Sequence, residues 1–111
     1  MRILKNKWRS GEQKLPVVNW HNQASKAFRK AYNHILKDSY SNAELVKNCI
    51  REIIDPLPEH LEKYPPEKYR KDNPGNYRAF EAYSYRVAYR HSEKEIRILR
   101  VRHIKQEPKE Y

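Results

Sequence analysis

The chain has 111 residues, the size of one small domain, which leaves little room for a second. Its formal net charge of +10 is concentrated in residues 1–30 and 61–111, so we expect a surface that attracts polyanions such as nucleic acids and acidic proteins. One cysteine excludes an intrachain disulfide, and no apolar run approaches the roughly 18 residues that span a bilayer, so the sequence predicts a folded cytoplasmic protein without a membrane anchor.

The first strand is expected after a polar N-terminal stretch. Residues 1–14 are basic around isolated apolar side chains and sustain no period of 2 or 3.6 residues, so we interpret them as an extension and residues 15–111 as one domain. Residues 15–20 (LPVVNW) are apolar and partly β-branched, and Pro16 favours a strand that starts at a sheet edge.

Two helices follow in the predicted order. The first has one apolar stripe with spacing i, i+3, i+4 and i+7, formed by Ala24, Ala27, Phe28, Ala31, Tyr32, Ile35 and Leu36. Residues 41–44 (SNAE) match a capping box. In this motif the Ser41 hydroxyl accepts a hydrogen bond from a free amide of the first turn, and the Glu44 side chain accepts one from the Ser41 amide, so we expect the second helix to start there. Its stripe comprises Ala43, Val46, Ile50, Ile53, Ile54 and Leu57, and Pro56 should end the helix near Asp55.

Three strands are expected after a connection over residues 56–75, which holds five of the seven prolines. Residues 76–82, 83–91 and 95–103 alternate in polarity and are separated by tight turns at Tyr83-Ser84 and at residues 92–94. Packing the helical hairpin on this antiparallel meander buries both helix stripes and one sheet face. The sequence therefore predicts an α+β fold in the order β-α-α-β-β-β.

Several ordered landmarks carry a family resemblance. They are NYRAF (residues 76–80), YRVAY (85–89), ILRVRH (98–103), EPKEY (107–111) and the helix junction at residues 39–44. In this order and spacing, residues 16–111 resemble the RelE/ParE superfamily of toxins from bacterial type II toxin–antitoxin systems. The resemblance implies a growth-arresting toxin held inactive by a cognate antitoxin, acting by ribosome-dependent mRNA cleavage or by poisoning DNA gyrase, without a cofactor.

The resemblance also suggests catalytic residues. Arg86 in YRVAY matches an arginine that RelE-like nucleases place on the scissile phosphate, and His103 lies near a catalytic histidine of related toxins. Tyr111 resembles a tyrosine that assists cleavage. RNA cleavage without a metal needs a base, an acid and positive charge around one phosphate, so these side chains must converge on one face.

Four further basic residues are candidates for nucleic-acid contact. The resemblance places Arg78 near lysines that related toxins use. Arg100 and Arg102 share one face of a strand. Lys105 could replace an arginine that the family carries where this chain has Gln106. The neutral Gln106 favours a non-catalytic, gyrase-binding toxin. No His or Cys spacing indicates a metal site. Charge and tyrosines alone would also permit a small nucleic-acid-binding protein without toxicity.

Overall fold

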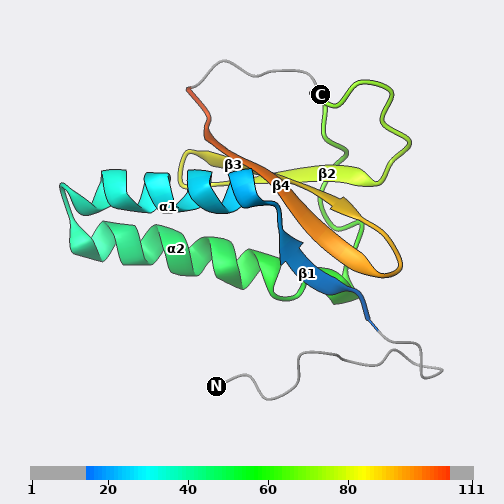
Figure 1. The fold of residues 1–111 in the computed structure, drawn as a ribbon, viewed down its shortest axis with the longest axis horizontal. Coiled ribbons are helices and arrows are strands. Elements are labelled where there is room, and N and C mark those ends of the chain that lie inside the picture. The colour runs from blue at the N-terminus through cyan, green and yellow to red at the C-terminus, as the bar shows by residue number, and fades with distance from the viewer. Residues whose placement is uncertain (1–14, 106–111) are drawn as a thin grey trace.

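A helical hairpin packs against one face of a four-stranded sheet (Figure 1). The computed structural model describes residues 15–105; the expected extension at 1–14 and residues Gln106 and Tyr111 lie outside the described residues. The elements, in chain order, are β1 (Val17–Trp20), α1 (Asn22–Leu36), α2 (Tyr40–Ile54), the short 3-10 helix η1 (Leu57–Glu59), β2 (Tyr77–Ala82), β3 (Tyr85–His91) and β4 (Glu95–His103). The α+β fold and the order β-α-α-β-β-β are confirmed.

The strand order in the sheet is β1-β4-β3-β2. The predicted meander of β2, β3 and β4 is antiparallel throughout, and β1 pairs in parallel with the early part of β4, from Val17 opposite Glu95 to Trp20 opposite Ile98. A parallel pair needs a long crossover, which the helical hairpin and the meander supply. The first strand is therefore an edge strand, as Pro16 indicated.

The second helix begins two residues earlier than the capping box predicted. Ser39, not Ser41, is the N-cap: its backbone is extended (φ −160°, ψ 115°) and its Oγ accepts a hydrogen bond from the Asn42 amide at 3.1 Å. The Glu44 carboxylate accepts hydrogen bonds from the Tyr32 hydroxyl and from the Lys47 ammonium instead of reaching back. The predicted capping box was wrong: Ser39 caps the helix, and Glu44 is engaged by Tyr32 of the first helix and by Lys47.

The core lies between the hairpin and the sheet. Its fully buried large side chains are Tyr89, Ile50, Leu57, Ile96, Ile98 and Val87. Most residues of both predicted helix stripes face this core, but Leu36 is 39% exposed near the end of α1, and Tyr32 donates to Glu44 on α2 instead of joining the core. Helix α2 ends at Ile54, before Pro56, as predicted.

Two local irregularities shape the meander. Tyr83 and Ser84 both have positive φ (49° and 70°), the conformation of the tight turns that match the twist of a hairpin. In β4 the register jumps from Ile98 to Arg100, so that Leu99 forms a bulge. The bulge lets Ile98 and Val101 both face the core although they are three residues apart.

Candidate functional site

Arg86 lies in β3 on the sheet face that points away from the helices. Its neighbours Tyr85 and Val87 belong to the core, and side chains alternate along a strand, so Arg86 projects to the outer face. Its Nη2 donates to Glu67 Oε1 at 2.6 Å, and its Nη1 donates to Glu81 Oε2 at 2.9 Å. Both terminal nitrogens of the guanidinium are thus engaged by carboxylates.

The Arg86–Glu67 ion pair is largely removed from solvent. The side chains are 11% and 3% exposed, whereas Glu81 is about half exposed. Burial by itself lowers the pKa of Arg86, but the hydrogen bonds and charges of Glu67 and Glu81 outweigh it and raise that pKa above its ordinary value. Arg86 is therefore a fixed cation whose charge is matched within the fold.

An aromatic ring covers the same pair of strands. The guanidinium carbons of Arg86 and Arg102 each lie 5.2 Å from the centroid of the Tyr69 ring, a cation–π distance. The Tyr69 amide donates to Glu67 Oε1 at 3.3 Å, which fixes the connection over the outer face. Glu67 and Tyr69 escaped sequence reasoning because they lie in the proline-rich connection, where no periodicity marks a buried side chain.

His103 lies on the opposite face from Arg86. It is paired in register with Tyr85, and the two rings meet edge to face with centroids 5.2 Å apart. Its Nδ1 accepts a hydrogen bond from the Lys105 amide at 3.0 Å, which orients the imidazole. Since Tyr85 faces the helices and Arg86 faces away, the two expected catalytic side chains are separated by the sheet.

The other basic candidates are also divided between faces. Arg100 and Arg102 project from β4 to the outer face, opposite Ala88 and Arg86. Arg78 is paired with the core residue Tyr89 and holds the connection, donating to the carbonyls of Gly75 at 2.9 Å and Tyr64 at 3.0 Å. Lys105 is exposed just after β4. The structure brings Arg86, Arg100 and Arg102 together and leaves Arg78 and His103 apart from them.

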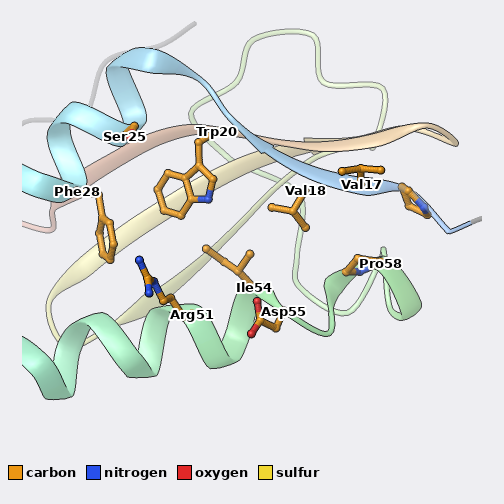
Figure 2. Close-up of a pocket in the computed structure, with 10 residues that line it drawn as sticks. Val17, Val18, Trp20, Ser25, Phe28, Arg51, Ile54, Asp55 and Pro58 are labelled. Carbon is orange, nitrogen blue, oxygen red and sulfur yellow. The ribbon is translucent and has the colours of Figure 1, made fainter. Parts of the chain in front are cut away.

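A groove lies between the edge strand and the hairpin, with a volume of about 630 Å³. Figure 2 shows side chains from β1, α1 and α2 gathered around it. Its walls include Val18, Trp20, Phe28 and Ile54, and the rings of Trp20 and Phe28 are 5.2 Å apart. Arg51 also lines it. The groove runs beside the edge of β1 that pairs with no strand in the described part of the chain.

Comparison with known proteins identifies the fold. Residues 18–108 match the family model described as the ParE toxin of the type II toxin–antitoxin system parDE. The chain belongs to the ParE toxin family. Among seven matching chains of solved structures, a chain of the chromosomal ParDE toxin–antitoxin system from P. aeruginosa aligns with a TM-score of 0.62 and 21% identity, over 80% of this chain and 96% of that one. No curated protein matches this chain.

Membership of the ParE family makes this protein the toxin of a type II toxin–antitoxin module and implies an antitoxin partner. Within residues 15–105, no helix is long and apolar enough to cross a membrane. The family and the fold together account for the ordered landmarks in the sequence.

Proposed function

We propose that this ParE-family toxin arrests growth without cutting RNA, by binding DNA gyrase. The main support for this proposal is that Arg86 and His103 point to opposite faces of the sheet. Of the two activities that the family resemblance implies, only mRNA cleavage requires these side chains to meet at one phosphodiester. Binding to gyrase requires no such convergence.

The state of Arg86 supports the same choice. To grip a scissile phosphate, its guanidinium would have to leave Glu67, and the buried carboxylate would then lose its counter-charge. Glu81 and the Tyr69 ring hold the guanidinium in place as well. A side chain held in this way contributes to the packing of the outer face rather than to substrate binding.

The test compares two purified systems. We expect the toxin to inhibit supercoiling by gyrase and to leave mRNA intact in a cell-free translation reaction, as read by primer extension. His103→Gln should keep its full effect on gyrase and on bacterial growth, because His103 lies on the face of the sheet away from Arg86 and its ring contacts Tyr85 and the Lys105 amide. Ribosome-dependent cuts in the mRNA would refute the proposal, and their loss in His103→Gln would assign them to that side chain.

We further propose that the antitoxin places an apolar segment in the groove beside β1. The groove offers aromatic and aliphatic walls next to an unpaired strand edge, which is the arrangement that binds extended or helical segments of a partner. The net charge of +10 favours an acidic partner. The acidic charge of the antitoxin would speed its encounter with the toxin. Its apolar side chains, once in the groove, would slow its dissociation.

Val17 and Leu45 provide a matched pair of variants for this docking site. Both are exposed apolar residues (38% and 49%), but only Val17 lines the groove. We expect Val17→Lys to remain toxic and to escape neutralisation when the antitoxin encoded beside it is co-expressed. Leu45→Lys should be neutralised normally. Neutralisation of both variants would place the antitoxin elsewhere.

A further inference from the structure

The outer face of α1 is basic and carries no acidic side chain. Helix α1 contains no aspartate or glutamate. A shallow hollow of about 520 Å³ along this helix is lined by six polar residues: Lys26, Arg29, Lys30, Asn33, His34 and Lys37. Among the residues that the structure describes, none of its four Lys and Arg side chains forms an ion pair. Their charge is therefore available to an external partner.

The neighbouring helix shows that this charge is a property of α1 and not of the hairpin. Helix α2 carries two acidic residues, Glu44 and Glu52, and two basic residues, Lys47 and Arg51. Lys47 is paired with Glu44 at 3.0 Å. The two helices have the same length, but only α1 presents unbalanced positive charge.

The lining of the hollow indicates the kind of partner. It contains no apolar side chain, in contrast to the groove beside β1. A peptide that folds on a helix face needs apolar anchors in pockets for its affinity. Binding to a phosphate backbone needs only cations and hydrogen-bond donors, because release of counterions supplies most of the free energy. The chemistry of the hollow therefore favours nucleic acid over an acidic protein segment.

The dimensions of the row favour duplex DNA. Lys26 and Lys37 are eleven residues apart in helical conformation, about 16 Å along the axis at 1.5 Å per residue. The major groove of B-DNA is about 12 Å wide and admits a helix, whereas the major groove of duplex RNA is deep and narrow. The end of the hairpin that carries Lys37 projects beyond the sheet (Figure 1), which leaves it accessible to a rod-shaped ligand.

From these observations we propose that the outer face of α1 binds the phosphate backbone of duplex DNA. The cations at the two ends of the row contact phosphates on either side of the major groove, and Arg29 and Lys30 contribute between them. This site shares no residue with the basic candidates on β2 and β4. It also differs from the groove beside β1, so the toxin could hold DNA and a protein partner at the same time.

The test uses the full-length protein and a fluorescein-labelled DNA duplex of about 20 base pairs, several times longer than the row of cations. Anisotropy titrations between about 50 and 200 mM salt give both the dissociation constant and its salt dependence. In Lys26→Gln/Arg29→Gln/Lys30→Gln we expect at least tenfold weaker binding at about 100 mM salt, and a log–log salt slope smaller by about 2 to 3. No gyrase is present, so the outcome is independent of the proposed target.

Two controls separate this site from net charge and from folding. The first control replaces three exposed lysines of the connection, with the same loss of charge: Lys63→Gln/Lys68→Gln/Lys71→Gln. The second keeps the charge of α1 as Lys26→Arg/Arg29→Lys/Lys30→Arg. Both should bind DNA within about twofold of the unmodified protein. Thermal unfolding of all three variants identifies any that fail to fold. The charge-conserving variant changes the same three side chains, so its normal binding shows that loss in the glutamine variant comes from lost charge and not from the substitutions themselves.

Three results would overturn the proposal. One is equal loss of DNA binding in the α1 and connection variants, which would show that binding depends on the net charge of the protein and not on this face. Another is equally tight binding to an RNA duplex of the same sequence. The third is binding of polyglutamate but not of DNA, with loss in the α1 variant, which would make the face a site for an acidic protein.

Discussion

Replacing Glu67 by glutamine should destabilise the protein by leaving the charge of Arg86 without its buried partner. The variant keeps the size of the side chain but removes the negative charge 2.6 Å from Arg86 Nη2. Leaving a buried charge without its partner costs about 3–5 kcal/mol. Because Glu81 still contacts the guanidinium at 2.9 Å and the new amide can accept a hydrogen bond, we expect a loss of about 2–3 kcal/mol.

Urea denaturation at neutral pH measures this loss directly, and the melting temperature should fall by about 10–20 °C for a domain of this size. The matched control is Glu81→Gln, which removes the other carboxylate from the same arginine. Its side chain is 52% exposed, so the cost should be about 0–1 kcal/mol. Salt at about 1 M should abolish the effect of Glu81→Gln and leave most of that of Glu67→Gln, because salt screens exposed charges far more than buried ones.

A loss below about 0.5 kcal/mol for Glu67→Gln would refute this reasoning, because it would mean that the pair gains nothing over solvated charges. A double-mutant cycle with Arg86→Met and Glu67→Met separates the pair from its surroundings. The double variant should be closer in stability to the natural protein than either single variant, since it leaves no charge of this pair buried alone, whereas each single variant does.

Three further predictions test local features of the fold. Ser39→Ala should cost about 1 kcal/mol in urea denaturation, as the loss of an N-cap does, whereas Ser41→Ala should stay within about 0.5 kcal/mol, and the reverse order would restore the capping box. Ser84→Gly should raise stability by about 0.5–1 kcal/mol, because Ser84 has φ 70° in the tight turn; a loss of stability would show that the serine side chain has a role there. The hydrogen bond from Tyr32 lowers the pKa of Glu44 below 4.5, so its contribution to stability is present above pH 4.5 and is lost as the pH falls through the lowered pKa; in Tyr32→Phe an NMR titration should find that pKa moved back towards 4.5.

Local sequence patterns determined the elements of this protein and most of their ends, the start of α2 at Tyr40 being the exception. The helical stripes, the stop before Pro56 and the three strands of the meander all follow from side chains within one or two turns or pleats of each other, where burial imposes a period. The bulge at Leu99 was within reach of the same reasoning. The alternation of apolar and basic residues in β4 changes phase there, from Ile96 and Ile98 to Val101.

Contacts between distant segments decided the candidate site, and the sequence held no local signal for them. Glu67 reaches Arg86 from 19 residues away, through a connection whose composition indicates only an irregular path. Arg86 and His103 were both candidates for catalysis, but the register of β3 against β4 sets them on opposite faces. Such partners are selected by the desolvation of charges when the sheet and the connection pack together, and that free energy exists only in the folded chain.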